Sequence, residues 1–202
     1  MDIEIDYGDI FLNTAARQFI QLGVNNVTYE SIVQECKGDS QAPPVEYKNL
    51  QDIVSAMAPI FFDARKKLCN SVNLPDNLAE EFVQIMKHCS DFFLFFSPQT
   101  VVLLRERYTY AFEIYEKHLK DVVLQKIEKN FITGIKQGEY QVDFNPIISA
   151  KLCLDQVQVA FDQLIFPNDI YNPWDVIRVI TRNQLFAMCT DPKLSMSILN
   201  TY

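Results

Sequence analysis

The sequence lacks the features of a membrane or secreted protein. No stretch of its 202 residues approaches the roughly 20 consecutive apolar residues that a helix needs to span a bilayer. The N-terminus is acidic, where a signal peptide would be basic and then apolar. We therefore expect a cytoplasmic protein with no membrane partner.

Cysteine and histidine are too few and too scattered to suggest a metal centre or a disulfide framework. The five cysteines are odd in number and include no Cys-x-x-Cys pair, so buried free thiols are expected. The two histidines, His88 and His118, lack the spacing of metal ligands. Cys89 follows His88 directly, but neighbours on a helix point in different directions and do not form a nucleophile and base. We predict no catalytic residue, no metal and no cofactor, and we do not expect an enzyme.

Basic residues are scarce in the N-terminal part of the chain. The whole chain has a formal charge of −8, and residues 1–60 contain nine acidic residues against three basic ones, a net charge of −6. Non-specific affinity for DNA comes from lysine and arginine, which release counterions from phosphates. This region is therefore unfavourable for binding nucleic acid by charge alone.

No strand pattern of useful length and no internal repeat is present, whereas helical periodicity recurs along the chain. Apolar residues at steps of three and four predict an all-α protein. Proline, asparagine and glycine divide the helices, because they favour helix starts and ends. The expected helices cover about 9–22, 29–38, 50–68, 78–97, 98–108, 109–137, 146–164 and 173–190.

The most specific signals lie in the first third of the chain. Thr28 is placed to cap a short helix, with Val27 and Ile32 at the two ends of a hydrophobic staple. Gly23 ends the helix before it and Gly38 closes it. Two short helices with tight turns, followed by a third element, are typical of a helix-turn-helix. Two consecutive prolines at 43–44 would leave the third element little more than one turn, at residues 45–47.

With its flanking residues, this stretch resembles the N-terminal domain of the TetR (tetracycline-repressor-like) transcriptional regulators. The matching residues are Ala15, Ala16, Phe19, Gly23, Thr28, Ile32, Gly38, Ser40, Tyr47, Lys48 and Asn49. The recognition segment departs from the family, because prolines and an acid stand where basic and aromatic residues are usual. The resemblance implies a helix-turn-helix domain at 1–49 and a helical ligand-binding and dimerisation domain at 50–202. A long helix from about residue 50, with Pro59 expected to kink it, would bridge the two.

The resemblance also implies three sets of site residues. Contacts to double-stranded DNA would come from Thr28, Tyr29, Ser40, Gln41, Tyr47 and Lys48. A pocket for a small apolar effector would include His88, Phe92, Phe95, Tyr110 and Gln156. The last two helices have surplus apolar residues, which suggests a partner, and a homodimer interface would include Val157, Phe161, Trp174, Ile177, Ile180 and Leu185.

Each set has a plainer interpretation. The first could be capping and solvent residues of a domain that no longer binds DNA, and the aromatic residues could be ordinary core. Trp174 could pack within its own loop. Taken with its three sets of site residues, the resemblance implies a homodimeric regulator whose DNA binding responds to an effector. The alternative is a protein of the same fold that binds a ligand or partner but has lost specific DNA binding.

Overall fold

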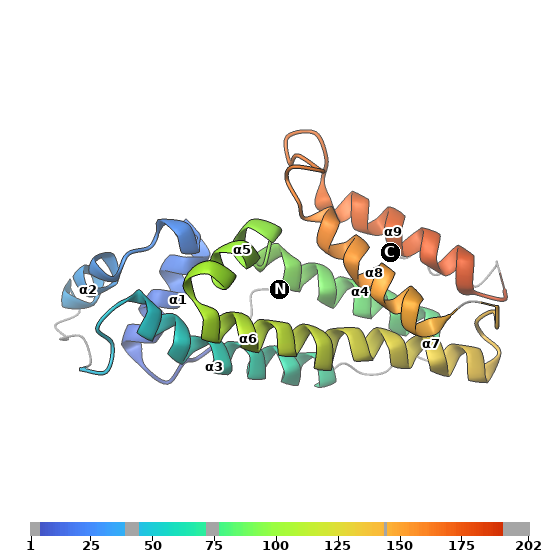
Figure 1. Cartoon of the computed structure of the whole chain (residues 1–202), viewed down its shortest axis with the longest axis horizontal. Coiled ribbons are helices and arrows are strands. Elements are labelled where there is room, and N and C mark those ends of the chain that lie inside the picture. The colour runs from blue at the N-terminus through green and yellow to red at the C-terminus, as the bar shows by residue number, and fades with distance from the viewer. Residues whose placement is uncertain (1–4, 39–44, 72–76, 144, 192–202) are drawn as a thin grey trace. The chain divides into compact units, whose positions relative to one another are not determined.

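The protein is all-helical, as predicted. The computed structural model describes residues 5–38, 45–71, 77–143 and 145–191, and it has no strand in these ranges beyond one isolated bridge. The α-helices are α1 (Ile10–Leu22), α2 (Tyr29–Gly38), α3 (Leu50–Ser71), α4 (Leu78–Phe95), α5 (Pro98–Arg107), α6 (Thr109–His118), α7 (Gln125–Gln137), α8 (Pro146–Ala160) and α9 (Pro173–Met188) (Figure 1). In these ranges, no helix is both long enough and apolar enough to cross a membrane.

Internal contacts group the chain into two compact units. Unit 1 comprises Met1–Asn70 with Thr100–His118, and unit 2 comprises Ser71–Gln99 with Leu119–Tyr202. The predicted boundary at residue 49 falls at the start of α3. The contacts instead keep most of α3 with the N-terminal helices, because α3 carries Ile53 and Met57 into their core.

Unit 1 is organised around a small apolar core formed by α1, α2 and the first turns of α3. Its buried members are Tyr7, Phe11, Leu12, Ala15, Val27, Ile32, Cys36, Ile53 and Met57. Both ends of the predicted staple, Val27 and Ile32, are therefore buried. Gly23 adopts a positive φ of 78° where α1 ends, which favours glycine because it has no Cβ.

The predicted helix starts in unit 1 are confirmed by their hydrogen bonds. Thr28 Oγ1 accepts a 3.1 Å bond from the Ser31 amide at the start of α2. Asn49 Oδ1 accepts a 3.0 Å bond from the Asp52 amide at the start of α3. Each bond satisfies an amide that the helix itself leaves without a partner.

The segment before α3 differs from its prediction. Residues 45–47 begin with a turn and are not helical, so the expected helical turn there is absent. Residues 39–44, with both prolines and the predicted contacts Ser40 and Gln41, lie outside the described residues. The described part therefore contains the first two helices of the expected motif and not its third. Pro59 lies within α3, and the kink expected there stays a prediction.

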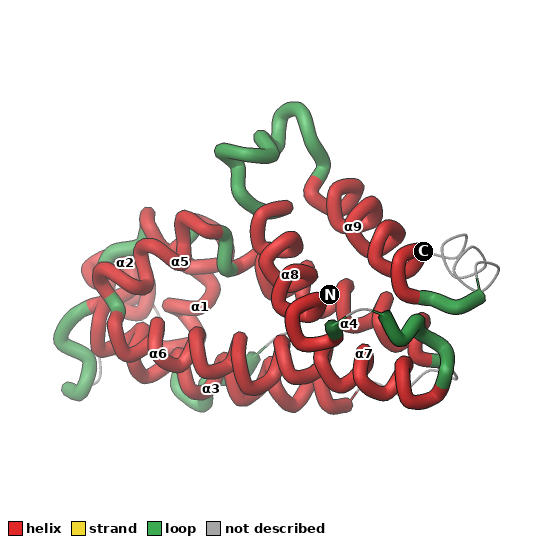
Figure 2. Tube along the Cα trace, turned by 45° about the vertical axis from the view of Figure 1, so that its right-hand side comes forward, coloured by secondary structure: helices red, strands yellow, loops and turns green. Residues whose placement is uncertain are grey.

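Unit 2 is built from α4, α7, α8 and α9, which pack against one another (Figure 2). The predicted asparagine caps are confirmed: Asn145 Oδ1 accepts from Ile147 and Ile148 amides, and Asn172 Oδ1 accepts from the Trp174 amide. A proline follows each cap as the first residue of the helix, where a missing amide hydrogen costs little. The large side chains buried most completely in this unit are Phe82, Met86, Phe92, Phe93, Ile127, Phe131, Tyr140, Leu154, Ile177 and Leu185.

The connection after α7 joins the ends of three helices. Gly138 takes the left-handed conformation that ends α7, as predicted. Tyr140 then pairs with Cys189 through an isolated bridge, next to a 2.8 Å bond from the Gln141 amide to the Met188 carbonyl. The Tyr140 hydroxyl bonds to Asn130 on α7, which also donates to the Leu78 carbonyl at the start of α4.

Two helical regions differ in detail from the predictions. The helix expected at 109–137 is helical throughout, but the segment Leu119–Leu124 is a π-helix, labelled η2, which the periodicity does not predict. The helix expected at 146–164 ends at Ala160. Asp162 stops it there, because its carboxylate accepts from the Leu164 amide and stabilises a turn. All five cysteines are free and buried, as expected.

Candidate functional site

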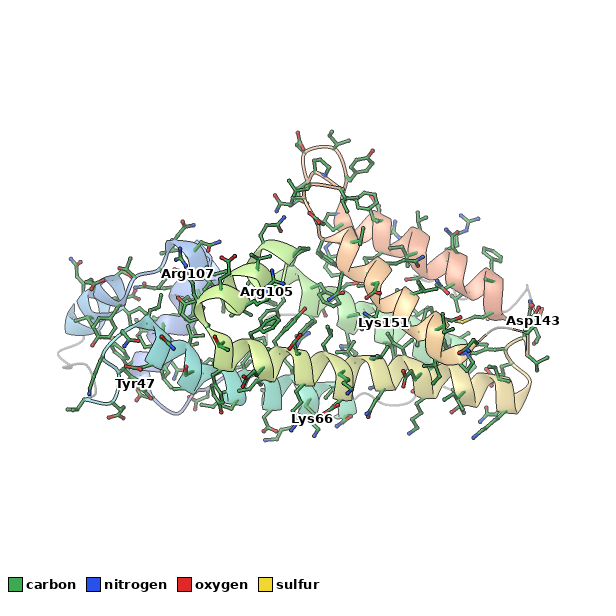
Figure 3. The ribbon with its side chains drawn as sticks, in the orientation of Figure 1. Tyr47, Lys66, Arg105, Arg107, Asp143 and Lys151 are labelled. Carbon is green, nitrogen blue, oxygen red and sulfur yellow. The ribbon has the colours of Figure 1, made fainter. Side chains whose placement is uncertain are left out.

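The predicted DNA-contact residues divide into structural and exposed ones. The Tyr29 hydroxyl donates a 2.7 Å hydrogen bond to the Tyr47 carbonyl, and the Tyr47 ring stacks on Phe11 with centroids 5.7 Å apart. These two tyrosines fasten the segment before α3, where Tyr47 is labelled in Figure 3, onto the first two helices. The Thr28 hydroxyl caps α2, although its side chain is exposed. Lys48 is exposed, and of the described set it is the one cation.

The electrostatics of this region are acidic in the structure as in the sequence. Arg17 on α1 forms a 3.2 Å ion pair with Glu35 on α2, so its charge is already balanced. The pKa of Tyr47 is raised, first by burial and then by the negative charges of Asp9 and Glu46. The negative charges of Asp9 and Glu46, which disfavour ionisation of Tyr47, would also repel the phosphates of DNA.

The predicted effector residues differ in burial and belong to both units. Phe92 is buried in unit 2, with its ring stacked on Phe96 at 4.9 Å and edge-on to Phe93 at 5.2 Å. Phe95 and Gln156 are exposed, and His88 is half-buried. Tyr110 is also exposed and belongs to unit 1.

One open groove of about 520 Å³ lies in unit 1, between Ile5 and Asp6 and the face of α3 that carries Pro59, Asp63 and Lys67. None of the five predicted pocket residues lines it. Its charged groups are partly balanced, because Lys67 and Asp63 form a 2.8 Å ion pair. The groove therefore has little of the apolar enclosure that small-molecule sites usually have.

The predicted dimer residues are mostly core. Four of the six, Val157, Phe161, Ile177 and Leu185, are buried within unit 2, whereas Trp174 is exposed and Ile180 is half-buried. The helices nevertheless expose other large apolar side chains: Ile147, Ile148, Leu152 and Val159 on α8, Val179 and Phe186 on α9, and Leu164, Ile165, Ile170 and Tyr171 in the connection. A partner would contact these residues. Periodicity cannot separate the two sets, because both sides of each helix are apolar.

A buried cationic group in unit 1 was not predicted from the sequence. Arg65 on α3 is 4% exposed and His118 at the end of α6 is 6% exposed. The Phe62 ring lies 5.2 Å from the His118 ring and 6.4 Å from the Tyr115 ring, centroid to centroid. Phe62 and Arg65 are three residues apart on α3, as Tyr115 and His118 are on α6, so each pair lies on one face of its helix.

The surroundings of His118 oppose its protonation. Its pKa falls to about 4, because burial disfavours the imidazolium and because Arg65 and Lys66 add positive charge nearby. The imidazole is therefore neutral at pH 7. Lys66 is exposed on the outer side of α3 (Figure 3), and Arg65 is the buried one of the two. The sequence contained a signal for this burial. At helical steps of three and four residues, Arg65 stands between the apolar residues Phe61 and Phe62 and the apolar residues Leu68 and Cys69, on the same face of the helix.

Comparison with known proteins adds no assignment, since the chain matches no protein-family model, no curated protein and no solved structure. Within the described residues, no group of three or more histidine, cysteine or acidic side chains could hold a metal ion. The interpretation of the sites therefore depends on the residues of this chain.

Proposed function

We propose that this chain is a TetR-like transcriptional regulator that acts as a homodimer, binds double-stranded DNA through its N-terminal helices and responds to a small effector. The observation that carries the proposal is the arrangement of the residues in which the resemblance lies. Ala15 and Ile32 are fully buried in the core of α1 and α2, and Thr28 and Asn49 cap α2 and α3. These four matching residues therefore have structural roles in unit 1, as the resemblance implies for a helix-turn-helix domain.

The homodimer is supported by the exposed apolar residues of α8, α9 and their connection. Val179 and Phe186 stand seven residues apart on α9, two turns along one face, and are 56% and 40% exposed. Apolar residues exposed on one helix face mark an interaction site where they gather into a patch. Two copies joined here would bring two DNA-binding units to adjacent half-sites, so two weak contacts would combine into a stronger one.

The effector would act by shifting a population. The effector binds one conformation of the dimer more tightly than the other, and this ratio of affinities sets the limit. The DNA affinity can change by no more than that ratio. The long helix α3 connects the DNA-binding core to the rest of its unit, and so it is the element through which we expect the change to pass.

The direct test is DNA binding by the purified protein, measured as fluorescence anisotropy on DNA from upstream of its own coding region. We expect binding at low salt, with an affinity that falls as salt rises. Lys48→Ala should lower the slope of log affinity against log salt by about one per subunit, because one phosphate contact per subunit is lost. Lys129→Ala, an exposed lysine of unit 2, is the matched control and should leave the slope unchanged. The absence of binding at micromolar dimer would count against the regulator.

The second candidate is a protein of the same fold that binds a ligand or partner and no longer binds DNA specifically. The observation that favours it is the use of Tyr29 and Tyr47 within the N-terminal core, beside a paired Arg17 and an excess of acid. The same experiment separates the two candidates. A dimer that binds a small molecule but shows no salt-dependent affinity for any DNA would establish the second.

A further inference from the structure

The open groove of unit 1, which we call the α3 groove, is not used by the sites proposed above. None of the described residues assigned to DNA, effector or dimer contacts lines it. It has a volume of about 520 Å³, and four of its seven described lining residues are apolar: Ile5, Pro59, Ile60 and Ala64. Ile5 and Ile60 also pack against the core of unit 1, so the groove continues that core to the surface.

The α3 groove follows one face of its helix. Pro59, Asp63 and Lys67 line it at steps of four residues, so they lie on successive turns of α3. At a rise of about 1.5 Å per residue, the distance along the helix from Pro59 to Lys67 is about 12 Å. The groove therefore suits an elongated ligand. Because it is open along this length, one side of the ligand would stay in water.

The groove has one negative charge that no cation balances. Its charged lining residues are Asp6, Asp63 and Lys67. Lys67 forms a 2.8 Å ion pair with Asp63, so these two charges cancel. Asp6 has no ion-pair partner among the described residues. A ligand with a single positive charge would complete the balance.

The Asp6 carboxylate is oriented by hydrogen bonds and still has a free oxygen. Its Oδ1 accepts a 2.8 Å bond from the Gly8 amide and a 3.1 Å bond from the Asn13 side chain. These bonds lower the pKa of Asp6, so the group is ionised at neutral pH. No described residue donates to Oδ2, which is therefore available to a ligand.

We propose that the α3 groove binds a small organic monocation, an ammonium ion on an elongated apolar body. The ammonium pairs with the free oxygen of Asp6, and the apolar body lies along Pro59, Ile60 and Ala64. Charge decides the class of ligand, because an anion would meet a net negative charge and a neutral molecule would gain no ion pair. The site goes beyond the regulator proposed above, since it needs neither DNA binding nor the predicted effector residues.

A bound ligand would join two parts of unit 1. Ile5 and Asp6 precede α1, whereas the other lining residues belong to α3. A ligand that contacts both walls binds the folded protein and not the unfolded chain, so it raises the Tm by mass action.

The test compares matched amines and alcohols on the full chain. Hexylammonium and octylammonium are titrated beside hexanol and octanol, with the Tm and calorimetric heat as readouts. We expect both ammonium ions to bind more tightly than their alcohols, and octylammonium more tightly than hexylammonium because it fills more of the groove. Added sodium chloride should weaken only the ammonium ions, because it screens exposed charges. Methylammonium, which has no apolar body, should leave the Tm unchanged.

Three variants separate charge from shape. Asp6→Asn removes the charge but keeps an oxygen for Gly8 and Asn13, and it should weaken ammonium binding by about two- to fivefold, the effect of an exposed ion pair. Glu30→Gln removes one negative charge from an exposed position of α2 outside the groove, and this matched control should bind as the parent does. Ala64→Leu fills part of the groove and should weaken both the amines and the alcohols.

NMR of the isoleucine methyl groups locates the ligand in the parent protein, so the test does not depend on any variant folding. The Ile5 and Ile60 signals should shift as the ammonium ion is added, because both residues line the groove. Ile177, buried in unit 2, should show no shift.

Four outcomes would overturn the proposal. They are alcohols that bind as tightly as their amines, unchanged affinity in Asp6→Asn, an equal loss in Asp6→Asn and Glu30→Gln, and no shift of Ile5 and Ile60 with any amine of the panel. DNA binding is measured separately and without amine. Its absence would remove the regulator and leave the cation site, whereas DNA binding without an amine response would do the reverse.

Discussion

Gly134 on α7 is the position where one added methyl group should do the most damage. A Cβ built at this residue would lie less than 3.0 Å from three atoms of the Tyr140 ring. Tyr140 cannot easily move away, because it is 1% exposed, packs edge-on against Phe131 and donates a 3.0 Å hydrogen bond to Asn130. The pKa of Tyr140 is raised by its burial, so the hydroxyl stays protonated and able to donate. Gly134→Ala must therefore displace a buried, hydrogen-bonded ring.

Two opposing effects decide the size of the change. Alanine in place of glycine stabilises an exposed helix interior by about 1 kcal/mol. Overpacking a dense core usually destabilises by about 1–3 kcal/mol, and displacing Tyr140 also removes its hydrogen bond, worth about 1 kcal/mol. Since the helical gain offsets only the lost hydrogen bond, we expect Gly134→Ala to lower the free energy of unfolding by about 1–3 kcal/mol.

Urea unfolding followed by circular dichroism measures this change. Lys136→Ala, at an exposed position of the same helix, controls for helix propensity and should stay within about 0.5 kcal/mol of the parent. A double-mutant cycle with Tyr140→Leu tests the cause, because in that background the added methyl should be better tolerated. Gly134→Ala as stable as the parent, or an equal loss in both backgrounds, would refute the argument.

Three further predictions concern pH, capping and association. The folded pKa of His118, about 4, lies below its ordinary 6.5, so the unfolded chain binds more protons between these values and stability should fall as the pH drops from 6.5 to 4. The loss in the free energy of unfolding approaches about 3 kcal/mol. His118→Gln should show a correspondingly smaller loss over that pH range in thermal or urea unfolding. If this variant and the parent have the same pH dependence, the effect is not due to His118. Asn172→Ala removes the cap on the Trp174 amide and should lower stability by about 1 kcal/mol, whereas Asn183→Ala, exposed within α9, should have little effect. Val179→Glu places a charge on the exposed apolar face of α9 and should give a monomer in sedimentation velocity at tens of micromolar. Gln137→Glu adds the same charge at an exposed position of α7 and should leave the dimer intact. A parent protein that is itself monomeric would refute the proposed dimer interface.

Helix boundaries were the most predictable feature, because they depend on local chemistry. Thr28, Asn49, Asn145 and Asn172 each accept from a first-turn amide as their positions predict. The errors have tertiary or neighbouring causes. The π-helical turn after His118 has no signature in the periodicity, and the early end of α8 depends on the turn made by Asp162.

Site residues were harder to predict, because exposure depends on which side of a helix finds a neighbour. Val157 and Ile177 were expected at a dimer interface and are buried in their own unit, whereas Ile148 and Val179 on the same helices are exposed. Arg65 shows the converse: it was not selected as a site residue and proves to be buried beside His118.

The sequence by itself determined the all-helical class, the helix starts and the free cysteines, because caps, glycines and apolar periodicity act over a few neighbouring residues. Only the tertiary structure decided which of two apolar helix faces is core, that Tyr29 and Tyr47 fasten the segment before α3, and that the side chains of Arg65 and His118 are buried in unit 1. Those outcomes depend on contacts between residues tens of positions apart, and local propensity carries no information about them.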